Sequence, residues 1–241
     1  MLEHSIRTQK KGIVTRITEQ IEHLRERIEN AADRAGRDAQ AIGIVAVSKK
    51  QPPGAIRAAQ AAGLTRFGEN YVQEALPKID AIGPPAEWHF IGAVQSNKAG
   101  EIAASFDWVH TVSGQRAARR LSTRRPPEAG DLQACIQLRP TGAPERAGCE
   151  AADVPALAGL LAELPNIRLR GLMMMPLPGQ SDAALRREFA RARVLLDSLH
   201  DAGYAADTLS MGMSGDLEAA IMEGSTLVRV GTDIFGPRTY D

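Results

Sequence analysis

The sequence predicts a single (β/α)8 barrel with an additional N-terminal helix. Short apolar runs alternate strictly with helical patterns, and this order favours a parallel sheet because parallel strands need helical crossovers. There are eight such runs, and the 241 residues match the length of about 250 that one α/β barrel needs. We find no linker, internal repeat or polar edge strand, so we expect residues 1–241 to form one closed-barrel domain.

Each expected strand is a short apolar run between turn residues. The eight runs cover residues 43–48, 65–67, 88–91, 108–111, 133–138, 168–172, 208–210 and 227–230. The helical segments between them cover residues 54–62, 71–82, 98–105, 115–124, 154–164, 183–202 and 216–223. An amphipathic helix is expected at residues 13–35, with an apolar face made of Ile17, Ile21, Leu24 and Ile28. Residues 1–12 are polar and basic and are expected to form a flexible tail.

The composition excludes several classes of protein. Lys and Arg together number 29, as do Asp and Glu, so the formal net charge is zero and a large nucleic-acid surface is disfavoured. The chain lacks the run of roughly 20 apolar residues that spans a membrane, and its first residues lack the apolar region of a secretory signal. We therefore expect a cytoplasmic protein without disulfides, in which Cys135 lies in the core.

Five arginines gather in and after the helix predicted at residues 115–124. They are Arg116, Arg119, Arg120, Arg124 and Arg125. The cluster is typical of a solvated helix face, and a docking patch is the alternative.

Lys49 ends an apolar strand at the end of the barrel where such folds place their chemistry. Strand alternation puts Val45, Val47 and Lys49 on one face, so Lys49 and Lys50 point in different directions. Apolar surroundings would disfavour the charged ammonium, and a neutral amine can attack an aldehyde to form a Schiff base. The spacing alone is also compatible with a solvated lysine pair at a strand end.

Two consecutive loops carry the features of a phosphate site. In the first, Ser214 is a candidate N-cap, which leaves the following amides as donors at the positive end of a helix dipole. Simple capping is the alternative role for Ser214. In the second, Gly231 lets a backbone N–H approach an oxyanion closely, and Thr232 adds a hydroxyl. Barrels often build a phosphate site after strands 7 and 8, so the two loops together favour a phosphate-bearing ligand.

Arg229 shares a strand face with Gly231 and is expected to point toward the same ligand. Because a guanidinium stays protonated, it could donate a hydrogen bond to a pyridine nitrogen and keep that nitrogen unprotonated. Such a ring is a poorer electron sink, so the expected chemistry is mild. A salt-bridged arginine of the barrel interior is the alternative.

Several long, unusual strings occur in order along the chain. They are AVSK at residues 46–49, FGENYVQE at 67–74, WHFIG at 88–92, QSNK at 95–98, GLM at 171–173, LSMGMS at 209–214 and VRVGTDIFG at 228–236. Together they resemble the pyridoxal phosphate homeostasis protein family, from about residue 15 to residue 238. The resemblance implies a barrel like the N-terminal domain of alanine racemase, with pyridoxal 5′-phosphate (PLP) held as a Schiff base on Lys49.

The resemblance also implies the other cofactor contacts. The residues concerned are Asn70, His89, Met173, Ser210, Ser214, Arg229, Gly231 and Thr232. Arg229 would lie near the pyridine nitrogen, and the phosphate would lie among the serines, Gly231 and Thr232. Members of the family are regarded as carriers or regulators of free PLP, without an established reaction, so apo-PLP enzymes are expected partners.

The chain departs from the family after the fifth strand. Arg139 stands where the family has a short amide, and Arg146 replaces the lysine of a Lys-Ser-Gly turn. The exchange at Arg146 keeps the charge but alters the geometry. These changes put the role of that loop in doubt and leave the expected lysine and phosphate contacts unchanged.

Two kinds of enzyme are the alternatives. An amino-acid racemase needs acid and base groups on both faces of its substrate, and in alanine racemase the second group comes from a β-rich domain that these 241 residues do not include. We therefore expect a non-catalytic protein and, without the racemase's dimer surface, a monomer. The second alternative is a barrel enzyme that forms a Schiff base with a phosphorylated sugar, and a bound chromophore would exclude it.

The histidines and methionines leave further alternatives open. His89 lies in an apolar strand and could be a core histidine instead of a cofactor contact. No histidine has the spacing of a metal ligand, so no metal is expected. Met173, Met174 and Met175 are expected to line the barrel, or to form an adaptable wall for a cofactor.

Overall fold

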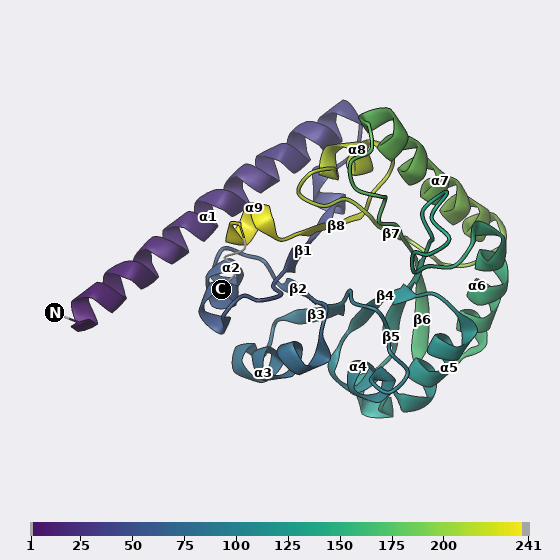
Figure 1. Ribbon diagram of the computed structural model, residues 1–241, viewed down its shortest axis with the longest axis horizontal. Helices are drawn as coiled ribbons and strands as arrows, with labels where there is room; N and C mark the ends of the chain where they lie inside the picture. Colours follow the sequence, from purple (N-terminus) through teal and green to yellow (C-terminus); the bar gives the residue numbers. More distant parts are fainter. Residues whose placement is uncertain (1, 238–241) are drawn as a thin grey trace.

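The computed structural model describes residues 2–237 and contains eight parallel strands in a closed barrel (Figure 1). The strands are β1 (Gly43–Val47), β2 (Arg66–Glu69), β3 (Glu87–Phe90), β4 (Trp108–Val112), β5 (Leu132–Gln137), β6 (Ile167–Met173), β7 (Thr208–Ser210) and β8 (Leu227–Val230). Each pairs with its neighbours in sequence, and β1 also pairs with β8, which closes the sheet. The predicted fold class is confirmed, and every strand end lies within two residues of the predicted one.

Helices cover the outside of this barrel. They are α1 (Leu2–Arg34), α2 (Pro53–Ala61), α3 (Val72–Ile82), α4 (Ala99–Ser105), α5 (Gln115–Arg124), α6 (Val154–Glu163), α7 (Asp182–Asp201), α8 (Leu217–Met222) and α9 (Thr232–Phe235). Short 3-10 helices lie at Ala39–Ala41, Pro127–Ala129 and Ala151–Asp153. The sequence did not predict α9, because a single turn is too short to show a helical period. Among the described helices, none has the length and apolar character needed to cross a membrane.

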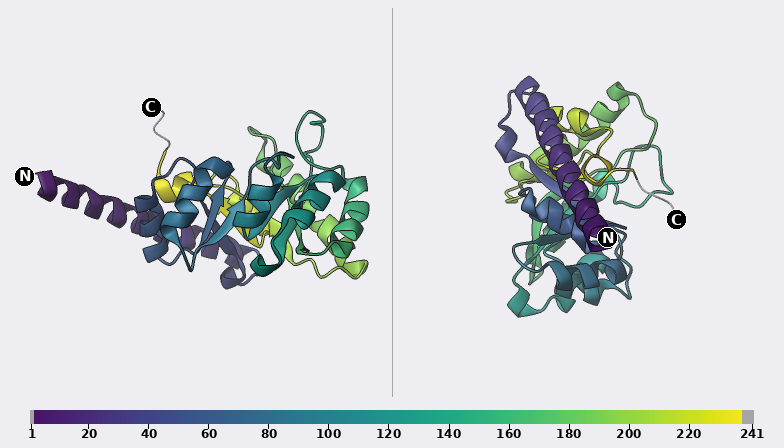
Figure 2. Two further views of the ribbon diagram at one scale, coloured as in Figure 1. Left: turned by 90° about the horizontal axis from the view of Figure 1, so that it is seen from below. Right: turned by 90° about the vertical axis from the view of Figure 1, so that its left-hand side faces the viewer.

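The additional helix α1 packs against α2, α8 and α9. Its predicted apolar face is confirmed, because Ile17, Ile21, Leu24 and Ile28 are all buried. The helix begins at Leu2 and continues through residues 2–12, where the sequence predicted a flexible tail. No proline interrupts this stretch, and extending an existing helix adds one hydrogen bond per ordered residue. Figure 2 shows the first turns of α1 extending beyond the barrel.

The arginine cluster divides between surface and interior. Arg116, Arg119 and Arg124 are exposed, as expected of a solvated face. The same expectation is wrong for Arg125, which is buried and satisfies carbonyl groups left open at the end of α4 and at the 3-10 turn that follows α5. Its guanidinium donates hydrogen bonds to the carbonyl oxygens of Ala103, Phe106, Ala129 and Gly130.

The barrel interior and its helical shell form the apolar core. Cys135 is fully buried in it, as predicted, and both Cys135 and Cys149 are free thiols. Burial raises the pKa of the Cys135 thiol to about 12, so this side chain is an inert apolar group.

Candidate functional site

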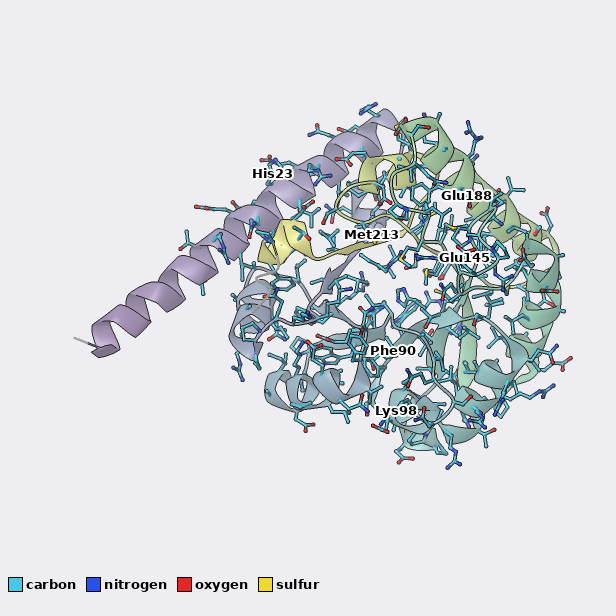
Figure 3. The ribbon with its side chains drawn as sticks, in the orientation of Figure 1. His23, Phe90, Lys98, Glu145, Glu188 and Met213 are labelled. Atoms are coloured by element: carbon cyan, nitrogen blue, oxygen red, sulfur yellow. The ribbon has the colours of Figure 1, made fainter. Side chains whose placement is uncertain are left out.

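A cavity of about 380 Å³ lies where the strands end and the loops begin. All eight strands, or the loops that follow them, contribute to its wall. The lining residues are Val47, Lys49, Asn70, Ile91, Gly92, Ala93, Thr111, Gln137, Ala147, Met173, Met175, Met213, Ser214, Gly215, Arg229, Gly231 and Thr232. Met213 is labelled in Figure 3. This is the end of the barrel at which the sequence predicted the chemistry.

A larger depression of about 950 Å³ lies at the opposite end, where the strands begin. Its charged side chains neutralise one another: Arg66 pairs with Glu87 at 3.1 Å, and Arg170 pairs with Asp207 at 2.7 Å. It contains no counterpart of Lys49 or of the glycine loops among the described residues. The smaller cavity is therefore the candidate site.

Most of the predicted site residues meet in this smaller cavity. Those that line it are Lys49, Asn70, Met173, Ser214, Arg229, Gly231 and Thr232. The predicted alternation of β1 is confirmed, because Val47 and Lys49 line the cavity together while Ser48 points outward to Glu69. His89 and Ser210 are buried, but they are not part of the cavity wall.

A buried ionic cluster fixes the backbone on both sides of Lys49. Lys78 Nζ donates hydrogen bonds to the Ser48 carbonyl at 2.8 Å and to carboxylate oxygens of Glu69 and Glu74, each at 2.7 Å. Ser48 Oγ donates to the same Glu69 oxygen at 2.7 Å. The backbone N–H of Lys50 donates to the Glu74 carboxylate. Residues 48 and 50 are thus both held, and the residue between them has a defined direction.

Lys50 adopts a left-handed backbone conformation, with φ at +62°. This region is unfavourable for residues other than glycine and persists where surrounding structure imposes it. The hydrogen bond to Glu74 supplies that constraint. The chain consequently turns sharply after Lys49, which leaves Lys49 in the cavity.

The pKa values of the two carboxylates in this cluster, Glu69 and Glu74, are shifted in opposite directions. Burial raises the pKa of Glu69, and the hydrogen bonds from Lys78 and Ser48 only partly oppose it. For Glu74, burial also acts to raise the pKa, but the contacts with Lys78 and Lys50 outweigh it and lower the pKa. Glu69 therefore depends on the Lys78 ammonium to stay ionised.

Arg229 forms part of the cavity wall at β8. Its Nη1 donates to Ser210 Oγ at 2.7 Å and to the Ser210 carbonyl, and its Nη2 donates to the Met174 carbonyl at 3.0 Å. Burial lowers the pKa of Arg229 to about 10, so the guanidinium stays charged at neutral pH. The site thus offers a fixed cation that does not titrate near neutrality.

The two predicted phosphate loops lie side by side and are joined by α1. Arg27 pairs with Glu218 at 2.7 Å and with Asp233, and it donates to the Ser214 carbonyl at 3.0 Å. One guanidinium therefore binds the loop after β7 and the loop after β8. No local pattern in the sequence indicates this role, because Glu218, Asp233 and Ser214 lie 191, 206 and 187 residues from Arg27.

The predicted capping role of Ser214 is wrong. The helix α8 begins at Leu217 with Asp216 as its N-cap, and the Asp216 carboxylate accepts the Met213 N–H at 2.5 Å. The Asp216 N–H in turn donates to the Met213 carbonyl at 3.1 Å, so residues 213–216 form a closed turn directly before the helix. Ser214 instead lies in the turn and lines the cavity.

Asn70 enters the cavity from the loop after β2. Its Oδ1 is buried and lacks a hydrogen-bond partner among the described residues. Gly92 packs against the Asn70 backbone so closely that a Cβ there would lie 2.0 Å from the Asn70 carbonyl oxygen. The missing side chain at Gly92 lets this loop take its place beside Asn70.

His89 and Ser210 lie beneath the cavity. Ser210 Oγ accepts the hydrogen bond from Arg229 and is 2.7 Å from His110 Nδ1. The two ring nitrogens of His89 are 2.8 Å from Glu87 Oε1 and 2.8 Å from His110 Nε2. Ser210 thus contacts Arg229 of the cavity wall. His89 is linked to Arg229 only through His110 and Ser210, and it lines the larger depression at the opposite end of the barrel.

The loop after β5, in which the sequence differs from the family pattern, is held together by Arg139. Arg139 pairs with Glu150 at 2.6 Å and donates to the carbonyl oxygens of Arg146 and Gly148. These contacts fold residues 139–150 back on themselves, and Ala147 of this loop lines the cavity. Arg139 therefore has a structural role in shaping one side of the cavity.

The buried histidine pair predicts a loss of stability in mild acid. Burial lowers the pKa values of both His89 and His110 below the ordinary 6.5. The unfolded chain therefore binds these protons at a higher pH than the folded chain, so the free energy of unfolding falls as the pH drops below about 6.5. Urea unfolding at about pH 7.5 and about pH 5.5 measures this fall, which is at most about 1.4 kcal/mol per histidine because pH 5.5 lies about one unit below the ordinary pKa.

An exposed histidine provides the control. His110→Asn should reduce the fall, whereas His23→Asn, on the outer face of α1 (Figure 3), should keep it. Equal stability at the two pH values would contradict the buried neutral pair. Burial raises the pKa of Glu69, so its protonation in acid opposes the fall, and the comparison with His110→Asn isolates the contribution of the histidine.

Comparison with known proteins agrees with this geometry. The alanine racemase N-terminal domain family matches residues 20–239. The alanine racemase of Corynebacterium glutamicum, 16% identical, superposes with a TM-score of 0.67 over 92% of this chain and 60% of its own, and so shares the fold. The fold and the site thus define an alanine racemase-like barrel.

Closer relatives identify the family. The pyridoxal phosphate homeostasis protein of Pseudomonas aeruginosa is 50% identical over 93% of this chain and 96% of its own length, and that of Escherichia coli K12 is 44% identical over 93% and 97%. The structure of PipY from Synechococcus elongatus with PLP bound is 35% identical, with a TM-score of 0.81 over 91% of this chain and all of PipY. The chain belongs to the pyridoxal phosphate homeostasis protein family.

Proposed function

We propose that this protein holds PLP as a Schiff base on Lys49 and carries or buffers the cofactor without turning over a substrate. One observation carries the proposal: Lys49, the Arg229 cation and two loops rich in glycine and hydroxyl groups meet in a single cavity. The names of its relatives and the PLP in the PipY structure support it.

The residues present fit this cofactor. The cavity volume of about 380 Å³ lies within the range of roughly 300–1,000 Å³ typical of small-molecule sites. The unpartnered Asn70 Oδ1 is a buried acceptor that a ligand donor would satisfy. Lys49 would hold the aldehyde carbon, Arg229 would face the ring nitrogen, and Ser214, Gly231 and Thr232 would hold the phosphate. When bound, PLP supplies an electrophilic aldehyde and an electron-withdrawing ring.

The ionisable groups of the cavity favour a carrier over a racemase. Among the described residues that line it, Lys49 and Arg229 are the ones with ionisable side chains. Arg229 stays protonated, so it cannot exchange a proton with a substrate at neutral pH. Racemisation requires a proton donor and an acceptor on opposite faces. Lys49 serves one face at most, and it therefore acts as a tether.

The wider setting is part of the same proposal. We infer a cytoplasmic monomer that delivers PLP to apo-enzymes. The free, buried cysteines fit a reducing compartment, and sedimentation at about the chain mass of 25.9 kDa tests the monomer.

A transfer experiment tests the function. The protein should bind about one PLP per chain. Once loaded, it should restore activity to an apo-aminotransferase added in excess. Incubation with a panel of amino acids should give turnover far below the median enzyme rate of about 10 s⁻¹. Turnover at ordinary enzyme rates, or cofactor that never leaves for the apo-enzyme, would contradict the proposal.

A further inference from the structure

A continuous chain of hydrogen bonds crosses the barrel interior from its N-terminal end to Arg229. Glu87 Oε1 is 2.8 Å from His89 Nε2, and His89 Nδ1 is 2.8 Å from His110 Nε2. His110 Nδ1 is 2.7 Å from Ser210 Oγ, which is 2.7 Å from Arg229 Nη1. The three middle side chains are completely buried. This series of hydrogen bonds joins the half-buried carboxylate of Glu87 at one end of the barrel to the guanidinium of Arg229 in the candidate site at the other.

The carboxylate end sets the direction of these hydrogen bonds. Glu87 also accepts a hydrogen bond from Arg66 Nε at 3.1 Å, and its pKa is lowered by the contact with His89 and by this guanidinium. An ionised carboxylate only accepts, so His89 Nε2 must carry a proton. A neutral His89 then accepts at Nδ1, which requires a proton on His110 Nε2. A neutral His110 in turn accepts at Nδ1 from the Ser210 hydroxyl.

The arginine end gives the same direction independently. Both protons of Arg229 Nη1 point to Ser210, one to its carbonyl and one to its Oγ. A guanidinium only donates, so Ser210 Oγ accepts from Arg229 and its own proton is left for His110 Nδ1. Among the described contacts of Ser210 Oγ, His110 is the remaining partner. The two ends therefore agree on one arrangement of protons.

Neighbouring rings hold this arrangement in place. Trp108 stacks on His89 with ring centroids 5.3 Å apart and an interplanar angle of 14°. The Arg170 guanidinium lies 4.7 Å above the centroid of Trp108 and closes the stack on the side of the larger depression. His89 belongs to the wall of the larger depression, but its side chain is fully buried there, and its hydrogen-bond partners are Glu87 and His110.

We propose that Glu87 is a distant positioning residue for Arg229, and that it acts by fixing both buried histidines in the Nε2–H form. With every donor aimed toward Glu87, the Ser210 oxygen presents its lone pairs to Arg229 and fixes one guanidinium nitrogen. The arrangement places a cation and a carboxylate at opposite ends of aligned bond dipoles, and aligned chains of this kind reinforce one another. Its consequence for the cofactor rests on the proposed function, since Arg229 would face the PLP ring nitrogen.

Histidine nitrogen NMR on the full-length protein tests the arrangement directly, with and without PLP. Both His89 and His110 should show a protonated Nε2 and an unprotonated Nδ1 at neutral pH. A protonated Nδ1 on either ring, or a charged imidazolium, would overturn the inference. This measurement does not depend on PLP binding, so it decides the inference even if the cofactor proposal fails.

Two substitutions of Glu87 separate positioning from bulk structure. Glu87→Gln keeps an acceptor oxygen and should preserve both tautomers and the visible absorption band of the PLP-loaded protein. Glu87→Leu removes the acceptor and should move His89 toward the Nδ1–H form and shift that band. Asp131→Leu removes an exposed carboxylate from the larger depression and leaves the hydrogen bonds between Glu87 and Arg229 intact. It should change neither the histidine tautomers nor the absorption band. Unchanged tautomers in Glu87→Leu would refute the role of Glu87, and absence of the band in the unsubstituted protein would refute the PLP proposal alone.

Discussion

Lys49→Ala is expected to reduce covalent PLP incorporation from about one adduct per chain to none. Lys49 lies in the cavity with the two loops that would hold the phosphate, and an alanine there has no amine to attack the aldehyde. Borohydride reduction of the loaded protein, followed by peptide mass analysis, measures the adduct at residue 49. The loops and Arg229 are unchanged in this variant, so weaker, non-covalent retention of PLP should persist.

The neighbouring lysine supplies the matched control. Lys50 has a left-handed backbone and lies outside the cavity wall, so Lys50→Asn changes the charge while keeping a residue that tolerates this conformation. It should retain the full adduct at Lys49. An adduct that persists in Lys49→Ala, or one that is lost equally in Lys50→Asn, would show that the cofactor is attached elsewhere.

Local patterns were sufficient to predict the fold and the centre of the site. Alternation along β1 and β8 is a property of the strand itself, so it placed Lys49, Arg229 and Gly231 on the inner face without tertiary information. Parallel strands with helical crossovers bring their C-terminal ends to one side, and the residues that end each strand therefore meet. These two rules account for the residues that the structure brings together.

The depth of a side chain along the barrel could not be predicted in the same way. His89 and Ile91 share a face of the same segment, but Ile91 lines the cavity while His89 does not. A strand rises about 3.3 Å per residue, so the two positions are separated by about 7 Å along the barrel. Alternation distinguishes inside from outside, and the level at which a ligand sits depends on the stagger of all eight strands.

Contacts between segments far apart in the chain could not be predicted from the sequence either. Long charged side chains are usually exposed, so the sequence predicts a solvated position for Arg125 and does not single out Arg27 or Lys78. Each instead satisfies partners that only the folded chain brings near. One signal was available for Lys78, because Glu74 precedes it by four residues and such pairs meet on a helix.

Lys78→Met should destabilise the protein by about 3–5 kcal/mol, the usual cost of leaving a buried charge without its partner. The Lys78 and Glu69 side chains are only 7% and 0% exposed, so water cannot replace the lost ammonium. Urea unfolding at neutral pH measures the change as a lower midpoint at constant slope. Lys98→Met provides the control, because the Lys98–Glu101 pair is partly exposed and should contribute no more than about 1 kcal/mol.

The double variant Lys78→Met/Glu69→Gln shows whether charge or packing causes the loss. A neutral amide at residue 69 needs no counterion and can still accept the Ser48 hydroxyl, so more than half of the lost stability should return. If the double variant is as unstable as the single one, the loss comes from packing. The Ser48 carbonyl lacks its Lys78 donor in both variants, so the covalent PLP adduct should form more slowly even where stability recovers. Recovery of stability without recovery of adduct formation would separate the two roles of Lys78: keeping Glu69 ionised and holding the backbone from which Lys49 extends.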